Sequence, residues 1–437
     1  MLLAALVLCP LLNGAALQEE NPPQDPPVAA EEESGEPAET VQPPEPAWPD
    51  YGTAATWAEL EAALRTLANA RPDVASLESI GKSRGGRDVW VLTLSDRFVG
   101  DPAGKPGLVV LDYHAPGEGA GASVALEIAR LLVEESRNEP TLDAILQGYA
   151  VYVVPCLDPD LRAPASADPA AERVEYAGNF PIGWRPDSLL PGSGAYPLSE
   201  PRTLALAEFL ATRANVSILL GFGGEGRTAE GLDAWEVPAA DRARFDVLYA
   251  SGAVVPEVEN WHEVPSGGSP FDYGYRALGM YPVILAQGSL PRSGAARADW
   301  VRSATRRALG YVGRLPRVSF GEPEVERLGP GLWRLDVPFD NHGLLPTLSE
   351  LGRRRFATGE IEISVSGATV VACSHRPDGV GSFSIEANRR TSFRVGQIGA
   401  GETTELCLIV EGQSGDVLEL EGTSARGGRA ARTITLP

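Results

Sequence analysis

Cysteine and lysine are both scarce in this chain of 437 residues. It has four cysteines in no Cys-x-x-Cys spacing, and its one Cys-x-His pair, Cys373-Ser-His375, has no second ligand pair near it in sequence, so the common structural zinc motifs are not indicated. Cys373 and Cys407 fall in strand-like stretches, where they form either a cross-strand disulfide or two small buried core residues. Lys82 and Lys105 are the only lysines, and every other basic residue is arginine. We interpret that imbalance as coding bias.

Positive charge is also in short supply. The formal net charge is −22, and no Lys/Arg cluster is available to face a phosphate backbone, so we expect no nucleic-acid partner. Part of the imbalance is local, because residues 17–50 hold ten acids and no Lys or Arg. The rest of the chain keeps about −12, an ordinary acidic surface.

The N-terminal apolar run is too short to be a membrane-spanning helix, which requires about 20 residues. Residues 1–16 hold this run and end in Gly14-x-Ala16, which is typical of a signal peptide, although the first basic residue is Arg65. We therefore expect an exported protein (periplasmic, cell-surface or secreted) with no transmembrane segment in its mature form. The alternatives are a lipid anchor at Cys9, which bulky Leu8 disfavours, and a cytosolic chain.

Composition predicts three further segments. Residues 17–47 are rich in Pro and Glu and should form a disordered linker. Residues 48–315 alternate strand and helix patterns, which predicts a three-layer α/β domain with a mixed, largely parallel sheet. Residues 316–437 hold short β-like runs between turn residues, which favours a small all-β, immunoglobulin-like sandwich. Its strands are expected at residues 332–337, 360–365, 392–395, 405–410, 417–420 and 433–436.

The expected elements of the α/β domain follow from periodicity and capping. Thr56-Trp-Ala-Glu59 is a capping box that begins a helix ending before Pro72. A helix should also begin at Ser199-Glu-Pro201, with Ser199 as its N-cap. Strands are expected at residues 74–80, 89–94, 108–113, 150–155, 216–220 and 282–286, and further helices at 122–135, 240–250, 270–278 and 295–313.

Six short motifs occur in one order between residues 51 and 313. They are Ile80-Gly-Lys-Ser-Arg-Gly-Gly-Arg-Asp88, Tyr113-His-Ala-Pro-Gly-Glu118, Pro155-Cys-Leu-Asp-Pro-Asp160, Val174-Glu-Tyr-Ala-Gly-Asn-Phe-Pro181, Gly192-Ser193 with Ser199-Glu-Pro201, and Ser266-Gly-Gly268 with Asp272-Tyr-Gly-Tyr275 and Gly279. In this order the motifs resemble those of the carboxypeptidase A/T-like zinc metallocarboxypeptidases. The resemblance implies that fold over about 60% of the chain.

The chemistry that the resemblance implies requires a zinc ion with three ligands, a glutamate base and arginines that hold the substrate. His114 falls on the first ligand position. Glu118 falls one residue beyond the second ligand position, where Gly117 stands, as an insertion at Pro116-Gly117 would produce. The carboxylate of Glu118 is then either the second ligand or simply a helix-start acid. Arg162 is a candidate substrate-binding arginine, and Arg173 is an equal alternative.

The remaining family positions lack the required side chains. The third ligand falls on Gly221 at the end of the strand at 216–220. The carboxylate-binding Asn-Arg pair falls on Ala177 and Gly178, and the general base falls on Ala286, or on Gln287 if the register slips. Loss of the base alone removes roughly 10²–10⁴-fold in rate.

A rebuilt site is the alternative. His262 could replace the missing ligand, with Glu263 or Glu225 as base, whereas His342 and His375 lie far away in the expected β-domain, and neither belongs to a complete metal-binding motif. We thus expect an exported zinc-carboxypeptidase-family protein that is catalytically inactive or impaired (a pseudoenzyme), has a binding or structural role and holds zinc weakly or not at all. A peptide or a cell-envelope ligand is its candidate partner. The competing hypotheses are an active metallocarboxypeptidase or amidohydrolase with a rebuilt site, and a cell-surface assembly protein whose cleft is irrelevant.

Overall fold

The computed structural model describes residues 51, 53, 55–112, 120–162, 178–189, 192–222, 237–250, 268–285, 293–355, 360–377 and 391–437. Residues Pro46–Pro437 form one compact unit. The predicted signal peptide and linker lie outside the described residues. Among the described helices, none combines the length and the apolar character that crossing a bilayer requires.

The α/β part has six described strands. They are β1 (Ala75–Lys82), β2 (Asp88–Leu94), β3 (Gly107–Asp112), β4 (Ala150–Val154), β5 (Val216–Phe222) and β6 (Tyr281–Leu285). Its described helices are α1 (Trp57–Ala70), α2 (Ala120–Arg130), α3 (Pro140–Gly148), α4 (Pro201–Ala211), α5 (Ala239–Ala250), α6 (Pro270–Asp272) and α7 (Ala295–Leu309). Shorter turns of helix are the 3₁₀ segments Pro102–Gly104 and Val312–Arg314 and the π segments Leu131–Glu135 and Tyr273–Ala277.

The six strands form one sheet in the order β1-β2-β4-β3-β5-β6. β1 pairs with β2 and β2 with β4 in antiparallel fashion, whereas the β4–β3, β3–β5 and β5–β6 pairs are parallel. The predicted mixed, largely parallel sheet is therefore confirmed. Its parallel part brings the carboxyl ends of four strands to one edge, where ligands bind in open α/β sheets.

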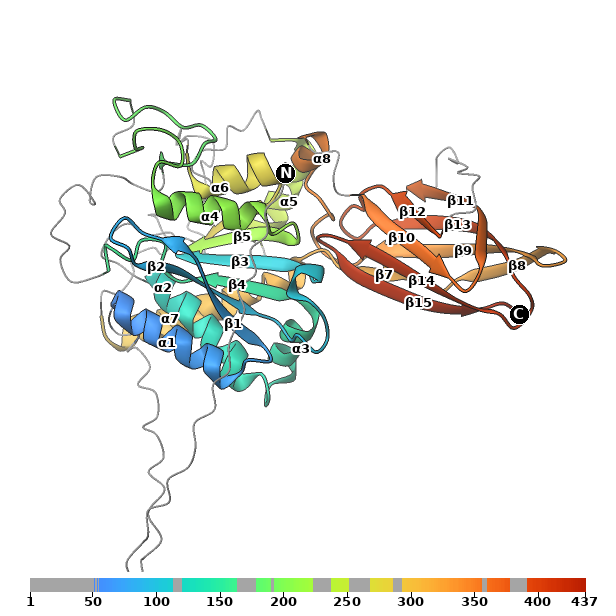
Figure 1. Ribbon diagram of the computed structural model, residues 1–437, viewed down its shortest axis with the longest axis horizontal. Helices are drawn as coiled ribbons and strands as arrows, with labels where there is room; N and C mark the ends of the chain where they lie inside the picture. Colours follow the sequence, from blue (N-terminus) through green and yellow to red (C-terminus); the bar gives the residue numbers. More distant parts are fainter. Residues whose placement is uncertain are drawn as a thin grey trace, which may run out of the picture. The chain divides into compact units, whose positions relative to one another are not determined.

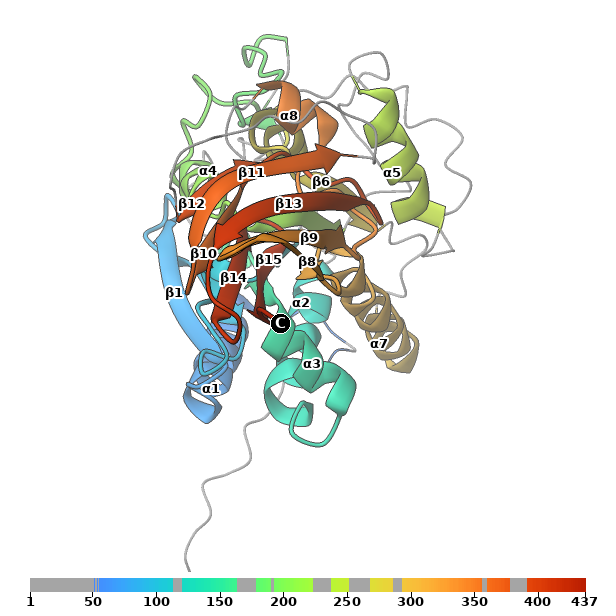
Figure 2. The ribbon, with the colours of Figure 1, turned by 90° about the vertical axis from the view of Figure 1, so that its right-hand side faces the viewer.

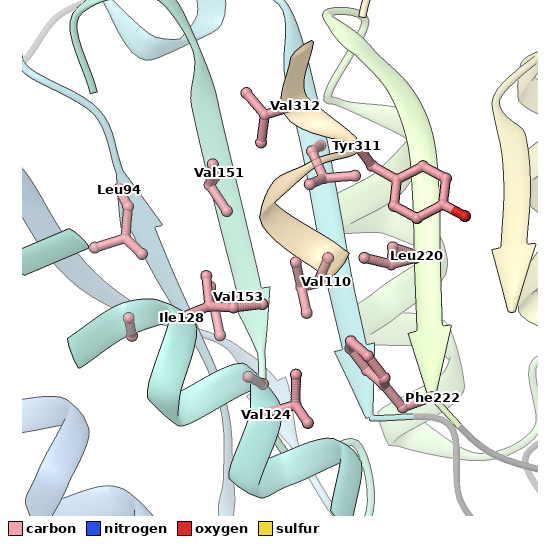
Figure 3. Close-up of a cluster of buried hydrophobic side chains, with 14 of the residues drawn as sticks. Leu94, Val110, Val124, Ile128, Val151, Val153, Leu220, Phe222, Tyr311 and Val312 are labelled. Carbon is pink, nitrogen blue, oxygen red and sulfur yellow. The ribbon is translucent and has the colours of Figure 1, made fainter. Parts of the chain in front are cut away.

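Helices cover both faces of this sheet because its strands are apolar on both sides (Figure 1). One face packs against α1, α2 and α7, and the other against α4 and Phe271 of α6. Figure 3 shows the first core, in which Val110, Val153 and Leu220 from neighbouring strands meet Val124 and Ile128 of α2. The strands are thus held in place by a hydrophobic core on each face of the sheet.

The C-terminal part is built from two antiparallel sheets (Figure 2). Its strands are β7 (Val318–Phe320), β8 (Glu324–Gly329), β9 (Leu332–Asn341), β10 (Ile361–Ser366), β11 (Thr369–Pro377), β12 (Ser392–Val395), β13 (Thr403–Glu411), β14 (Val417–Ser424) and β15 (Gly428–Thr435). The strand orders are β12-β10-β14-β15 and β11-β13-β9-β7, with β8 beside β9, and both sheets contribute to one hydrophobic core. The helix α8 (Glu350–Arg355) lies between β9 and β10 in sequence. The immunoglobulin-like topology and the boundary at residue 316 stay predictions.

The N-cap of α4 and the positions of Cys373 and Cys407 bear on two predictions from the sequence. Ser199 is not the N-cap of α4: Glu200 is, because Pro201 occupies the first helical position and holds the preceding residue in an extended conformation (φ −90°, ψ 126°). Cys373 pairs with Leu408 in the β11–β13 ladder, whereas Cys407 pairs with Ser374. This offset of one residue places the two cysteine side chains on opposite faces, so they are not positioned to form a disulfide with each other.

Candidate active-site framework

The strand ends of the parallel part lie level with one another. Asp112 at the end of β3 pairs with Phe222 of β5, and Phe222 pairs with Leu285 of β6. Each of these strands runs into residues outside the described ranges. His114, Glu118, Arg173, Ala177, Glu225, His262, Glu263, Ala286 and Gln287 all belong to those residues, so their predicted roles stay predictions.

Gly221, the predicted third-ligand position, is buried in β5 against an aromatic ring. A Cβ built on this glycine would lie 2.3 Å from Cζ and 3.1 Å from Cε1 of Phe271. No side chain can therefore be added at residue 221 unless the Phe271 ring moves. The next residue, Phe222, points into the opposite core and has no metal-binding atom. The described end of β5 thus supplies no donor for zinc.

A buried ion pair ends β3, two residues before His114. Arg162 donates from Nη2 to Asp112 Oδ2 at 2.7 Å and from Nη1 to the carbonyl oxygen of Ala55 at 3.3 Å. Asp112 is only 6% exposed, and its carboxylate lies against Gly121 in the first turn of α2, where a Cβ would come within 2.3 Å of Oδ1. The candidate substrate-binding arginine is therefore at the strand edge, but its charge is already engaged by Asp112.

Cys156 lies beside this ion pair and is buried. Burial raises the pKa of its thiol to about 12, despite the opposing effect of Arg162. A thiol with that pKa stays protonated at neutral pH and is a poor nucleophile. Thiol chemistry at Cys156 is therefore not a substitute for the metal chemistry.

The first and third sequence motifs meet at the carboxylate of Asp160. Ser83 donates to Oδ1 at 2.8 Å, the Gly85 N–H donates to Oδ2 at 2.8 Å, and Arg87 Nη1 donates to Oδ1 at 2.7 Å. A Cβ at Gly85 would approach Oδ1 to 2.4 Å, so glycine is required there. The aspartate thus fixes the turn between β1 and β2 onto the segment after β4.

A second charged group connects the same motifs to α4. Arg84 donates to Glu200, the N-cap of α4, and Arg202 Nη2 contacts Asp158 Oδ2 at 3.1 Å. Glu200 and Arg202 are almost completely buried. Buried charges persist in proteins when they are paired and hydrogen-bonded, so this pairing anchors the start of α4 beside the strand ends.

Asn179 joins the fourth and fifth motifs. Its side-chain amide donates to the carbonyl oxygen of Ser193 at 2.8 Å and to Ser199 Oγ at 2.9 Å, and its Oδ1 accepts from the Glu200 N–H at 3.1 Å. Ser199, predicted as a helix cap, is therefore a partner of Asn179.

The fourth and sixth motifs are joined through backbone contacts. Gly268 (φ +87°) accepts from the Phe180 N–H at 2.8 Å and donates to the carbonyl oxygen of Ile182 at 2.6 Å. A Cβ at residue 268 would lie 2.4 Å from the carbonyl oxygen of Gly178. The predicted anion-clamp position Gly178 is therefore part of a tight backbone contact.

The structure thus brings together the turn-shaping residues of five of the six motifs, and the second motif lies outside the described ranges. Within the described part of the chain, no group of three or more His, Cys, Asp or Glu side chains is arranged to hold a metal ion. His342 contacts Ser319 Oγ at 2.7 Å, in the C-terminal part. Sequence reasoning did not single out Phe271 or Asp112. The signal for Asp112 was a charge directly after an apolar strand, whereas no local pattern marks Phe271, which acts by packing across the chain.

Comparison with known proteins agrees with the motif order. Residues 60–228 match the zinc carboxypeptidase family model, and residues 317–435 match a family described as a domain of unknown function. The α/β part of the chain is therefore similar to the zinc carboxypeptidase family over residues 60–228.

Two curated relatives show the extent of the likeness. The chain is 25% identical to carboxypeptidase SOL1 of Arabidopsis thaliana over 152 residues, which cover 35% of this chain and 30% of that protein. It is 26% identical to carboxypeptidase M of Mus musculus over 169 residues, 36% of this chain and 35% of that protein. The chain thus spans about a third of the length of these relatives. Among solved structures, carboxypeptidase A from Helicoverpa armigera aligns with a TM-score of 0.47 and 16% identity, over 60% of this chain and 75% of that one.

Proposed function

We propose that this protein is an exported member of the zinc carboxypeptidase family whose cleft binds a peptide or cell-envelope ligand without hydrolysing it. Zinc, in this proposal, binds weakly or not at all. The domain division is the one the sequence predicts, with a carboxypeptidase-like domain at 48–315 and a β-sandwich at 316–437.

The single observation that carries the proposal is the packing of Gly221 against Phe271. A catalytic zinc site in this fold needs a third protein ligand, and a hydrogen atom at residue 221 cannot donate electrons to a metal. The ring of Phe271 occupies the place of a side chain, with Cζ 2.3 Å from the Cβ position. His114 and Glu118 would leave a bound cation with two protein ligands, too few for a closed or catalytic zinc site.

The preserved framework supports a binding role for the cleft. The charges of Asp160, Glu200 and Arg202 are used in hydrogen bonds that shape turns at the strand edge. These contacts need no metal, so the fold can persist after the chemical groups are lost. Removal of groups that hold a strained or desolvated site often stabilises a protein.

The test is release of C-terminal residues from a panel of peptides by the full-length protein in zinc-containing buffer. We expect no release above the buffer background, and the same result for the variants H114A and E118Q. Chelator-sensitive release by the wild-type protein that H114A abolishes would instead support the rebuilt site of His114, Glu118 and His262. In that case Gly221 is not the position that decides metal binding.

A further inference from the structure

We propose that a cavity between α4, the turn before β6 and the β14–β15 turn is a binding site for a small carboxylate with a short apolar tail. The cavity has a volume of about 220 Å³. Its floor is made of buried residues, namely Leu210, Met280, Leu348 and Arg426, and its rim carries exposed small residues such as Ala214 and Ala425. Its lining residues do not include the carboxyl ends of β3, β5 and β6, so the proposal does not depend on the proposed function of those strand ends.

Within the described residues, the cation on the floor of this cavity makes its hydrogen bonds to neutral groups. Arg426 is 6% exposed and donates to the carbonyl oxygens of Leu278 and Gly279. Burial lowers the pKa of its guanidinium to about 10, so the group still carries its charge at neutral pH. Fully buried charges are rarely found without a partner of opposite charge, because desolvation of an isolated ion is costly.

The nearby groups of the described chain do not supply that negative charge. Tyr281 is a phenol whose pKa is raised well above its ordinary value, first by burial and then by Asp241, so it stays neutral. Asp241 accepts hydrogen bonds from Tyr275, Tyr281 and the N–H groups of Glu350 and Leu351, and no ion pair joins it to Arg426. Among the described residues, the positive charge at Arg426 therefore meets the carbonyl dipoles at the end of the helical segment at 270–277 and no carboxylate.

The second arginine that lines the cavity is already neutralised. Arg213 donates to Glu78 Oε1 at 2.8 Å, and its guanidinium stacks on the ring of Phe209 at 4.6 Å. One anionic group, placed at Arg426, is thus what the site lacks. The hydroxyl of Thr347 is engaged with Gln397, so the rest of the ligand meets mainly apolar walls.

Size limits the ligand to a few atoms. At about 30 Å³ per water molecule, the cavity holds the equivalent of about seven waters. A linear monocarboxylate of about six to eight non-hydrogen atoms matches this volume, with its carboxylate on the guanidinium and its alkyl chain along Leu210, Met280 and Leu348. Guanidinium–carboxylate pairing in a fork geometry is the strongest contact that arginine offers.

The probe is sodium hexanoate, titrated into the full-length protein by calorimetry and by thermal unfolding. Hexanamide, which has the same shape without the charge, and sodium chloride at equal ionic strength are the controls. We expect saturable binding and a rise in Tm with hexanoate only. An equal response to hexanamide or to chloride, or no response to hexanoate, would overturn the proposal.

Two variants localise the binding. A425W places a large side chain on the exposed rim and should abolish the hexanoate response while the unliganded protein stays folded. R426Q should weaken hexanoate binding by at least about tenfold. If R426Q does not fold, A425W and the comparison of hexanoate with hexanamide and chloride still test the proposal. R302Q, which removes an arginine from the exposed face of α7, should leave binding unchanged. Binding of wild-type strength in A425W would place the hexanoate elsewhere and refute the proposal.

Discussion

Gly221 and Phe271 are 50 residues apart in the sequence. The contact between them leaves no space for a side chain at residue 221, near the end of β5. The sequence predicts that the third zinc-ligand position falls on this glycine. It could not indicate the ring that fills the vacated space, since that contact depends on how α6 packs on the sheet.

The variant G221A tests this contact. The new methyl group would overlap the Phe271 ring, so we expect the free energy of unfolding to fall by about 1–3 kcal/mol. Urea unfolding is the measurement, and G148A is the matched control, because nothing lies within 4 Å of a Cβ at Gly148. The double variant G221A/F271L should lose less stability than the sum of its single changes. If G221A is as stable as wild type, the site has room for a side chain.

Asp160 gives a prediction about pH. Burial raises the pKa of this carboxyl, but the hydrogen bonds from Gly85, Arg87 and Ser83 together outweigh burial and hold the pKa below its ordinary value. A group whose pKa is lower in the folded state stabilises the fold above its unfolded value of about 3.9 and loses that contribution as the pH falls through the folded pKa. D160N should therefore reduce stability by about 1–3 kcal/mol at pH 6, and the difference from wild type should shrink below about pH 4.

Acid unfolding of both proteins, followed by circular dichroism at several urea concentrations, measures that difference. D299N removes an exposed carboxylate paired with Arg302 and should change stability by less than about 0.5 kcal/mol. A difference between D160N and wild type that stays constant down to pH 2 would show that Asp160 is not ionised in the way its contacts indicate.

At the scale of elements, the regular parts of the fold could be read from the sequence. The capping box of Thr56 and Glu59 begins α1 as predicted, and the apolar runs became β2, β3, β4 and β5. These elements are encoded locally, by caps and by periodicity. The helices α3 and α8 and the strands β7, β8 and β11 were not predicted.

Two of the missed strands, β8 and β11, each have a physical reason. β8 is an edge strand whose residues are mostly exposed, so it lacks the apolar alternation that marks a half-buried strand. β11 contains an irregularity between Val370 and Ala372, which interrupts its alternation. The candidate site was predictable as a set of turns, but the hydrogen bonds that join them at Asp160 and Asn179 connect residues far apart in the sequence.

The attachment of α8 to the α/β part supplies a test at this scale. Asp241 of α5 accepts from the hydroxyls of Tyr275 and Tyr281, both at 2.7 Å, and from the N–H groups of Glu350 and Leu351 at 2.8 and 2.9 Å. In D241A these four buried donors lose their acceptor, so we expect a loss of about 3–5 kcal/mol. Y281F removes one donor and leaves the carboxylate three others, so it should lose about 1 kcal/mol.

Hydrogen exchange of the Glu350 and Leu351 amides reports this attachment directly. Exchange at both amides should be faster in D241N than in wild type, while amides in the centre of β13 keep their protection. Unchanged exchange at these two amides would mean that α8 is held by its other contacts, such as the Ser349 hydroxyl on the carbonyl oxygen of Gly279.

Over the whole molecule, the residues that shape the turns are present, whereas we predict that the residues needed for hydrolysis are missing. The paired charges of Arg84, Asp158, Asp160, Glu200 and Arg202 hold the turns of the sequence motifs, whereas Gly221 and Gly178 are the positions at which we predict that a zinc ligand and a substrate-binding arginine are missing. In our proposal, this scaffold binds a ligand without hydrolysing it. Its net charge of −22 further favours partners that are not polyanions.

The zinc content of the purified protein tests most directly whether the chain lacks a complete zinc site. The full-length protein, produced in zinc-supplemented medium and dialysed against metal-free buffer, is analysed for zinc per chain by mass spectrometry, with H114A as the matched control. The account predicts much less than one zinc per chain for the wild-type protein and the same value for H114A. One zinc per wild-type chain that survives dialysis and is lost in H114A would contradict it.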